Sequence, residues 1–324
     1  MPRAIRFGRF GGPEVLQYVD VDVDEPGPGQ AHVVHSAVGV NFIDVYHRTG
    51  LYPLTLPSGI GGEGAGVVVA TGAGVTHVRV GDRVAYTAHA PLGAYSTERL
   101  LDARWLVRLP QGVTDEAGAA MMLKGLTAWY LLHASFKVAA GDWIVLYAAA
   151  GGVGSIAAQW ARHLGARVIG VVGSAAKRDL AFANGCEHVL LESEPIPARV
   201  RELTGGAGVP VVYDSVGRDT FLQSLDCLRP HGVLVSFGNS SGKVEPFSLL
   251  ELMRRGSLYV TRPTLIDFIR ERERLEAGSA ALFEVVEKGV VKIEIGQRYE
   301  LRDAARAHID LEARRTTGSS LLIP

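Results

Sequence analysis

The sequence predicts an α/β protein with a doubly wound parallel sheet of six strands and a second, β-rich domain. Between residues 141 and 262, short apolar runs alternate with amphipathic segments, which is typical of βαβ units. A glycine turn at 151–154 follows the first of these runs. Residues 1–123 instead hold several short strand candidates separated by turns, which favours a small, partly open barrel.

In the N-terminal segment we expect strands where apolar and polar residues alternate. Residues 16–23 alternate in part, and residues 32–40 form a second candidate. Glycine becomes dense over 59–74, around a further valine-rich strand, which indicates bulges or close backbone approach. Residues 80–86 add a turn and a strand. Residues 115–133 lack proline and are rich in Ala, Leu and Met, as in one helix or a broken pair.

The middle of the chain alternates between the two kinds of element, and the tail changes pattern again. We predict strands near 143–149, 167–172, 188–191, 211–216, 232–237 and 257–261, and helices near 153–164, 175–184, 197–204, 219–228 and 246–255. In the tail we predict helices near 267–288 and 302–314, and strands near 297–301 and 319–323. We expect the tail to return to the first domain, which gives domains of 1–123 with 265–324, and 124–264.

The glycine turn reads Ala149-x-Gly151-x-x-Gly154 between an apolar strand and a helix. Ile156, Trp160 and Leu164 recur every four residues, which places them on one helix face. A helix that begins here has free N–H groups and a partial positive charge, so it can hold a phosphate. Alanine stands where a dinucleotide fingerprint usually has its first glycine, and such turns also occur for steric reasons alone. The turn favours cofactor binding without deciding it.

The residues after the second predicted strand bear on which nicotinamide cofactor is used. An NAD site usually has Asp or Glu here, whereas a 2′-phosphate needs hydroxyl and cationic donors. Ser174, Lys177 and Arg178 supply such donors and favour NADPH. The alternative is that Lys177 and Arg178 only solvate an exposed helix start. Glu192, after the third strand, would repel a 2′-phosphate if its carboxylate lay close. The alternative is that its side chain points away.

Two other polar segments are candidate binding loops. Phe237-Gly-Asn-Ser-Ser-Gly242 follows the fifth strand with small side chains and many donors, although this is also good turn chemistry. In the first domain, residues 41–52 concentrate polar and aromatic groups after an apolar strand. There, Tyr46 and Tyr52 could line a cofactor and stack on a flat substrate. The alternative is that they are buried tyrosines whose hydroxyls are satisfied locally.

Composition argues against several classes of protein. The net charge of −1 gives no general attraction to nucleic acid or anionic membrane. No apolar run is long enough to span a bilayer and no signal core is present, so we expect a cytoplasmic protein. Cys186 and Cys227 are not spaced as a pair, and no tight Cys/His cluster appears. A catalytic metal is therefore not expected.

Along essentially its whole length the chain resembles the zinc-independent, zeta-crystallin-like quinone oxidoreductase branch of the medium-chain dehydrogenases/reductases. It is particularly similar to the bacterial NADPH:quinone reductases. The motifs that carry the resemblance are Gly11-Gly-Pro-Glu-Val-Leu16, Val40-Asn-Phe-Ile-Asp44, Arg48-Thr-Gly-Leu-Tyr52-Pro, Pro57-Ser-Gly-Ile-Gly-Gly-Glu63-Gly-Ala-Gly, Leu123-Lys-Gly-Leu-Thr127, Ala148-Ala-Ala-Gly-Gly-Val-Gly154, Tyr213-Asp-Ser-Val-Gly-Arg-Asp219, Phe237-Gly-Asn-Ser-Ser-Gly242 and Gly318-Ser-Ser-Leu-Leu-Ile-Pro324. Val145 stands where leucine is usual.

The resemblance implies a GroES-like catalytic domain from both chain ends, a Rossmann domain between them, and a homodimer. Zinc-dependent relatives have a cysteine in place of Asn41 and a His-Glu pair in place of Gly62-Glu63. Carried over by residue, the active-site set is Asn41, Tyr46 and Tyr52. The implied cofactor contacts are Asn41, Asp44, Tyr46, Lys124, Thr127, Gly151, Gly152, Val153, Gly173, Ser174, Lys177, Ser215, Phe237, Gly238, Asn239, Ser240, Ser241 and Arg314. Close bacterial relatives have a tyrosine where Glu192 stands.

The implied reaction is metal-free transfer of a hydride from NADPH to a quinone. The sequence shows no acid of suitable pKa, so we expect the protein to act by positioning and by excluding solvent. Asn41 and the tyrosine hydroxyls would hydrogen-bond the acceptor oxygen. One alternative is an NADPH-dependent reductase of alkenal or enone double bonds. A less favoured one is an RNA-binding protein, since no basic and aromatic stripe is present.

Overall fold

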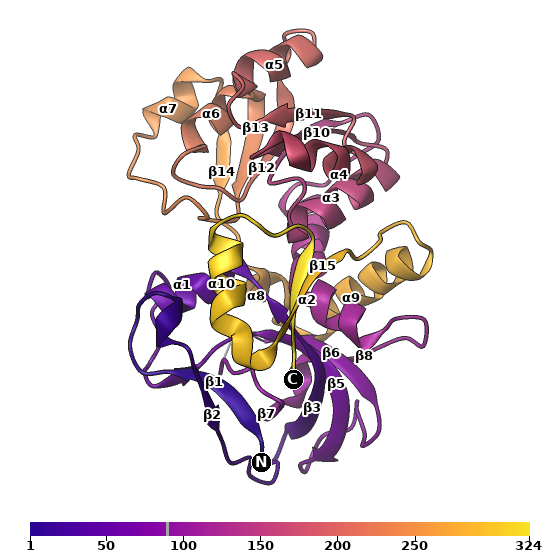
Figure 1. The fold of residues 1–324 in the computed structure, drawn as a ribbon. Coiled ribbons are helices and arrows are strands. Elements are labelled where there is room, and N and C mark those ends of the chain that lie inside the picture. Colours follow the sequence, from indigo (N-terminus) through magenta and orange to yellow (C-terminus); the bar gives the residue numbers. More distant parts are fainter. Residues whose placement is uncertain (89–90) are drawn as a thin grey trace. The chain divides into compact units, whose positions relative to one another are not determined.

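The computed structural model describes residues 1–88 and 91–324 and forms two compact units (Figure 1). The first unit consists of Met1–Lys124, Ile269–Glu287 and Ile293–Pro324, and the second of Gly125–Phe268 and Lys288–Lys292. Both ends of the chain therefore belong to the first unit. Among the described residues, no helix has the length and apolar character needed to cross a bilayer.

The second unit is built on a parallel sheet, as predicted. Its six strands are β9 (Trp143–Tyr147), β10 (Arg167–Val172), β11 (His188–Leu191), β12 (Val209–Asp214), β13 (Leu228–Ser236) and β14 (Tyr259–Thr261). Their order in the sheet is β11-β10-β9-β12-β13-β14. The order reverses between β9 and β12, and ligands of such sheets bind at the carboxyl ends of the strands at this point. The predicted doubly wound sheet is confirmed.

Helices cover this sheet on both of its faces, as the doubly wound fold requires (Figure 1). α3 (Gly152–His163) and α4 (Arg178–Ala183) pack against the β9–β11 half. α5 (Ile196–Leu203) and α6 (Phe221–Asp226) contact each other, and α6 packs on β12 and β13. Of the predicted apolar face of α3, Ile156 and Trp160 are buried, while Leu164 caps the helix and is half-buried.

The first unit is organised around one long strand, β3 (Gln30–Val40), which pairs with strands from both chain ends. Its neighbours are β5 (Glu63–Thr71), β7 (Glu98–Asp102) and the C-terminal β16 (Ser319–Ile323). The same sheet contains β15 (Ile295–Glu300), β6 (Arg83–Thr87) and β8 (Leu106–Arg108), and a second sheet has the order β2 (Gln17–Asp20), β1 (Arg3–Phe7), β4 (Ser58–Gly59). The expected close approach occurs at Gly66, where a Cβ would lie 1.9 Å from the Val34 carbonyl oxygen.

Several predicted element boundaries are wrong. The remaining helices are α1 (Phe42–Thr49), α2 (Asp115–Tyr130), α7 (Leu250–Arg254), α8 (Leu265–Ile269), α9 (Arg272–Glu287) and α10 (Ala304–Glu312). The single helix predicted near 267–288 is therefore two helices, separated by residues 270 and 271. Arg272 then starts α9 by donating to the carbonyl oxygens of Arg104 and Leu106. The first middle strand ends at Tyr147, because Ala148 takes a φ of 53° that no strand accommodates.

Candidate active site

The glycine turn after β9 is shaped by close contact between backbone segments. The Gly151 N–H donates to the Ala148 carbonyl oxygen at 2.8 Å, which closes the turn. A Cβ on Gly154 would lie 2.2 Å from the same carbonyl oxygen. Only glycine therefore lets α3 start so close to the strand. The turn is a cradle of backbone, as the sequence predicted.

The first turn of α3 presents N–H groups to this cradle. The Ser155 N–H is the first to bond within the helix, to the Gly151 carbonyl oxygen at 2.8 Å. The N–H groups of Gly152, Val153 and Gly154 precede it and have no intrahelical acceptor. Gly152 and Val153 are half-buried rather than covered. Together with the helix dipole, these donors suit an anion such as a pyrophosphate.

Asp214, the last residue of β12, organises the loop that follows the strand. Its fully buried carboxylate accepts four hydrogen bonds, from the N–H groups of Val216 (2.7 Å) and Gly217 (3.1 Å) and from the hydroxyls of Thr220 (2.7 Å) and Ser224 (2.8 Å). An aspartate that satisfies two backbone donors in this way makes a rigid turn. This role of Asp214 is not among the predictions from the sequence, although an Asp just before a turn is a recognisable signal.

The loop after β13 packs directly on the loop after β12. A Cβ on Gly238 would lie 2.3 Å from the Ser215 carbonyl oxygen. The Ser240 N–H donates to that oxygen at 3.3 Å, and the Ser241 N–H donates to the Val216 carbonyl oxygen at 2.9 Å. The structure thus brings together the predicted contacts of two loops, namely Ser215 with Phe237, Gly238, Asn239, Ser240 and Ser241. They lie at the carboxyl edge of the sheet, beside the point where the strand order reverses.

The candidate 2′-phosphate residues follow β10. Gly173 and Ser174 are exposed, and Lys177 is half-buried with its N–H bonded to the Ser174 carbonyl oxygen at 3.1 Å. Glu192 stands beside them, because its N–H donates to the carbonyl oxygen of Val172 at 3.0 Å. A carboxylate that reaches this loop would favour ribose hydroxyls over a phosphate.

In the first unit, Asn41 is held between two buried carboxylates. Its N–H donates to Asp44 Oδ2 at 2.9 Å, and its Nδ2 donates to Glu63 Oε2 at 2.7 Å. Asn41 precedes α1 and is 4% exposed, so both the backbone and the amide are fixed. Since Nδ2 must face the carboxylate, the amide can take only one of its two orientations.

Glu63 is fully buried and has a cation of its own. Lys124 Nζ donates to Oε2 at 3.1 Å, and the Leu123 N–H donates to Oε1 at 2.7 Å. Space for this carboxylate comes from Gly39, where a Cβ would lie 2.2 Å from Oε2. A buried charge persists only when it is paired and hydrogen-bonded, and this one is both.

Asp44 differs from Glu63 because its direct partners are neutral. Its Oδ2 accepts from the Tyr95 hydroxyl at 2.9 Å as well as from the Asn41 N–H. Burial raises the pKa of Asp44 to about 7, and the donated hydrogen bonds and Lys124 only partly offset this. The expectation that the site has no acid of suitable pKa is therefore wrong. Asp44 is 1% exposed and lies next to Asn41, whose N–H it binds.

Behind Asp44 runs a chain of hydrogen bonds that the sequence analysis missed. The Tyr95 hydroxyl lies 3.2 Å from His308 Nε2, and His308 Nδ1 lies 3.0 Å from Arg48 Nη1. Arg48 also forms a bidentate pair with Glu312 at 2.9 and 2.8 Å. Burial and the Arg48 charge lower the pKa of His308 to about 3, so its ring is neutral. No local pattern could reveal this chain, because Tyr95 and His308 are 213 residues apart.

Tyr46 and Tyr52 meet edge to face with ring centroids 5.2 Å apart. The Tyr52 N–H donates to the Tyr46 carbonyl oxygen at 3.1 Å, so the loop after α1 folds back on the helix. Tyr46 is 8% exposed and Tyr52 is half-buried. The structure thus brings the two predicted tyrosines together on one flank of α1.

The other predicted contacts are spread over both units. Lys124 and Thr127 lie on α2 and are buried, but the boundary between the units falls just after Lys124. Arg314 is exposed and takes a φ of 56° just after α10. Within residues 1–88 and 91–324, no group of three or more His, Cys, Asp or Glu side chains could hold a metal ion.

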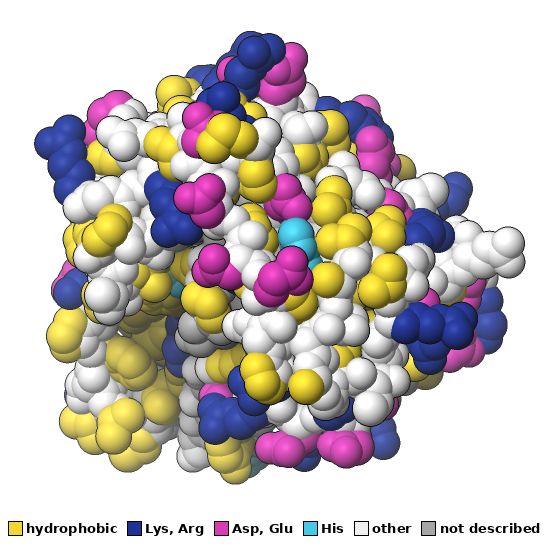
Figure 2. Space-filling model, turned by 90° about the horizontal axis from the view of Figure 1, so that it is seen from below, with side chains coloured by type: hydrophobic (Ala, Val, Ile, Leu, Met, Phe, Trp, Pro, Cys, Tyr) yellow, Lys and Arg dark blue, Asp and Glu magenta, His cyan; other side chains and the backbone are white. Residues whose placement is uncertain are grey.

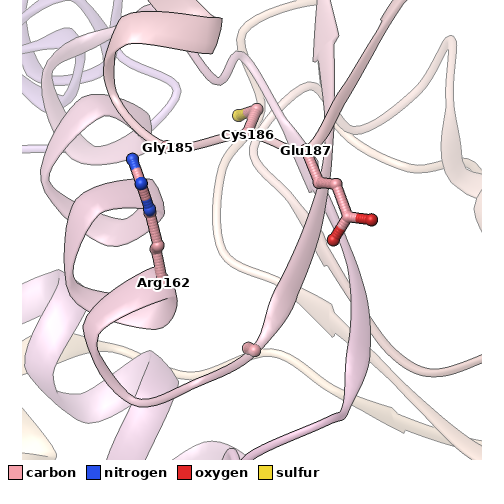
Figure 3. A pocket seen from close by; sticks show the side chains of 5 residues that line it. Arg162, Gly185, Cys186 and Glu187 are labelled. Atoms are coloured by element: carbon pink, nitrogen blue, oxygen red, sulfur yellow. The ribbon is translucent and has the colours of Figure 1, made fainter.

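A shallow hollow of about 290 Å³ lies at the opposite end of the parallel sheet (Figure 3). Its lining residues come from the end of α3 and the starts of β10 and β11, namely Arg162, Ala166, Gly185, Cys186 and Glu187. Ligands of this fold bind at the carboxyl ends of the strands, so this hollow is separate from the candidate site.

Comparison with known proteins identifies the family. The model of the alcohol dehydrogenase GroES-like domain matches residues 27–111, and that of the zinc-binding dehydrogenases matches 152–277. Over its full length the chain is 52% identical to the full-length quinone oxidoreductase of Pseudomonas aeruginosa. The chain belongs to the quinone oxidoreductase family. As a member of this family it has a first unit with the GroES-like fold and a second with the Rossmann fold.

Two other relatives bear on the chemistry of this quinone oxidoreductase family. A crystal structure of Escherichia coli quinone oxidoreductase complexed with NADPH matches 99% of this chain and 100% of its own, with a TM-score of 0.98 and 48% identity. The 2-haloacrylate reductase of a Burkholderia species is 45% identical over 97% of this chain and 96% of its own length.

Proposed function

We propose that the protein is a quinone reductase that uses NADPH and no metal, with the second unit as the cofactor domain and the first as the catalytic domain. Membership of the quinone oxidoreductase family supports this reading. The observation that carries it is the cradle at the carboxyl edge of the sheet, where the first turn of α3 leaves N–H groups without an intrahelical acceptor, beside two loops that pack on each other.

The residues of the second unit fit a dinucleotide. The first turn of α3, at Gly151, Gly152 and Val153, would hold the pyrophosphate. Ser215 and the loop Phe237, Gly238, Asn239, Ser240 and Ser241 would hold the nicotinamide end. Gly173, Ser174 and Lys177 would receive the 2′-phosphate, and Thr127 is a further proposed contact of this unit. Arg314, also a proposed contact, belongs to the first unit. NADPH supplies a hydride from C4 of its nicotinamide when it is bound.

In the first unit, Asn41 with Tyr46 and Tyr52 is the proposed acceptor site. The fixed amide of Asn41 keeps one N–H for Glu63 and offers its second to an acceptor oxygen. The aromatic pair of Tyr46 and Tyr52 is suited to stacking on a flat quinone. Asp44 and Lys124 act on this site through Asn41 and Glu63. A quinone that takes a hydride and one proton from solvent becomes a hydroquinone.

The purified protein should oxidise NADPH when a benzoquinone or naphthoquinone is added, seen as loss of the nicotinamide absorbance. The rate should be higher with NADPH than with NADH at equal concentration. Glu192 should make this difference in rate smaller, because a carboxylate disfavours the 2′-phosphate. Added zinc or a chelator should leave the rate unchanged. Absence of turnover across a quinone panel would contradict the proposal.

A second candidate is reduction of an activated carbon–carbon double bond. The 45% identity to a 2-haloacrylate reductase favours it. The same hydride would then go to a carbon conjugated to a carbonyl or carboxylate group. Rates on quinones, alkenals and 2-haloacrylates, measured side by side with one enzyme preparation, separate the two. A higher kcat/KM on the alkenes would replace the first candidate.

We propose that the protein forms a homodimer in the cytoplasm and has no nucleic-acid partner. In support, the edge strand β14 and the nearby α7 expose apolar side chains, namely those of Leu249, Leu250, Met253 and Tyr259. An exposed strand edge beside such side chains is a natural site for pairing with a second copy. Acidic and basic side chains are interspersed on the face in Figure 2, without a continuous basic stripe. Sedimentation equilibrium tests the dimer.

A further inference from the structure

Two buried residues behind Asn41, namely Tyr95 and His308, are not among the site residues that the family resemblance implies. We propose that Tyr95, with His308 behind it, is a positioning residue of the acceptor site, which holds the Asp44 carboxyl and through it Asn41. The inference rests on the proposed function, because its effect is on the step in which an acceptor is reduced.

The direction of every hydrogen bond in this chain follows from Arg48. A guanidinium has only donors, so Nη1 donates to His308 Nδ1 at 3.0 Å. The neutral ring must then carry its hydrogen on Nε2, which donates to the Tyr95 oxygen at 3.2 Å. The hydrogen of Tyr95 is left to bond Asp44 Oδ2 at 2.9 Å. His308 and Tyr95 therefore place a hydrogen-bond donor at Oδ2 of Asp44 and not at Oδ1.

This arrangement also fixes where Asp44 can hold a proton. Oδ2 already accepts from Tyr95 and from the Asn41 N–H, so a proton on the carboxyl must sit on Oδ1. Oδ1 is buried and has no hydrogen-bond partner among the described residues. When Asp44 is ionised, negative charge lies on this oxygen with no donor beside it.

Charged groups from several elements face Asp44. Lys124 on α2 favours the ionised form, and Glu63 on β5 opposes it. Lys124 is hydrogen-bonded to Glu63 rather than to Asp44. Arg48 on α1 reaches Asp44 only through the neutral His308 of α10 and Tyr95. Burial therefore dominates, and the pKa of Asp44 is raised to about 7.

The consequence for the reaction is electrostatic. Hydride transfer places negative charge on the acceptor beside Asn41, and ionised Asp44 repels that charge whereas neutral Asp44 does not. The hydride comes from NADPH and the proton from solvent, so Asp44 is not consumed. The rate should fall as the pH rises through about 7. Burial raises this midpoint and the hydrogen bond from Tyr95 lowers it, because that bond favours the ionised carboxyl.

The test compares pH profiles of kcat/KM for a naphthoquinone at saturating NADPH, from about pH 5.5 to 9. Tyr95→Phe removes the donor to Oδ2, raises the pKa of Asp44 and should move the decline upward by up to about one pH unit. Asp44→Asn cannot ionise and should abolish the decline while it keeps measurable activity. A change confined to overall rate, with unchanged midpoint, would overturn the inference.

Tyr86 offers a matched control. It is as buried as Tyr95, and its hydroxyl also bonds a buried histidine, His35 Nε2, at 2.8 Å. It makes no hydrogen bond with Asp44 or Asn41. Tyr86→Phe loses the same atom from the same unit and should keep the wild-type midpoint. A shift equal to that of Tyr95→Phe would show a general packing effect and refute the inference.

A second measurement does not depend on activity. The infrared band of a protonated carboxyl, present in wild type and absent in Asp44→Asn, should titrate near pH 7 and move upward in Tyr95→Phe. If the wild type reduces no quinone, the proposed function fails while this titration still tests the behaviour of Asp44. If quinones are reduced and neither the band nor the profile moves in Tyr95→Phe, only the present inference fails.

Discussion

The two units build their candidate sites from different parts of the chain. In the second unit the candidate site consists mainly of backbone, and Gly154 and Gly238 matter because a Cβ on either would collide with a carbonyl oxygen. In the first unit, the site is a set of buried polar side chains around Asn41, drawn from strands and helices far apart in the sequence. One site depends on empty space and free N–H groups, and the other depends on charges that must be matched.

This difference predicts how each site fails. A backbone cradle tolerates loss of side chains around it but not an added atom. A buried polar cluster tolerates neutral replacements of matching shape, yet suffers when one charge is left without its partner. The four predictions below test that contrast.

The largest effect is expected for Lys124→Met. It leaves the fully buried Glu63 carboxylate without its cation, which costs about 3–5 kcal/mol in the free energy of unfolding. Urea denaturation measures the loss. The double variant with Glu63→Gln should recover part of it. Arg298→Gln, which breaks the exposed pair with Glu116, is the control and should cost less than about 1 kcal/mol. Equal losses at the two sites would remove the distinction.

Gly154→Ala adds one carbon atom to the glycine turn of the second unit. Its Cβ would lie 2.2 Å from the Ala148 carbonyl oxygen, so α3 must shift, at a cost of about 1–3 kcal/mol. This shift of α3 should lower the affinity for NADPH at least tenfold, as measured by fluorescence titration. Gly8→Ala serves as the matched control, because a Cβ there meets nothing within 4 Å. An unchanged affinity in Gly154→Ala would show that the cradle is not the phosphate site.

The pH dependence of stability should report on the buried side chains of the first unit. His308 has a folded-state pKa of about 3, below the usual 6.5, so its stabilising contribution is complete above pH 6.5 and is lost as the pH falls. The loss is about 1.4 kcal/mol per pH unit. His308→Gln should flatten this slope, and His35, with a pKa of about 4, remains as an internal comparison. Parallel curves for wild type and variant between pH 4 and 6.5 would contradict the neutral, buried state of His308.

The smallest effect is expected for Lys177→Ala, a half-buried side chain in the second unit. It removes one cationic donor for a 2′-phosphate, worth about 1 kcal/mol, or a five- to tenfold weaker Kd for NADPH. The Kd for NADH should not change, since NADH has no such phosphate. Glu192→Gln should slightly lower the Kd for NADPH. Equal weakening for NADPH and NADH would take Lys177 out of the phosphate site.

Local pattern was enough for much of the second unit. The strands of the parallel sheet, the glycine turn and the loop at 237–242 were predicted to within a few residues, since each follows from apolar runs and turn residues that adjoin in sequence. The break between Ile269 and Arg272 was missed, because no glycine or proline at these positions interrupts the helical pattern of the sequence. The role of Asp214 is also local, because its carboxylate accepts from the N–H groups of Val216 and Gly217, two and three residues further on.

The sequence by itself determined the fold class and the glycine turn, because apolar periodicity and turn residues set these locally, while the resemblance to a family supplied the candidate residues Asn41, Tyr46 and Tyr52. Only the tertiary structure decided that Glu63 is paired with Lys124 while Asp44 is not. Burial, with no cation among the described residues bonded directly to this carboxylate, raises the pKa of Asp44 to about 7. The tertiary structure also decided that Tyr95 and His308 meet across 213 positions. The reason is physical: burial and distance between charges set a carboxyl's ionisation, and both are properties of the folded chain.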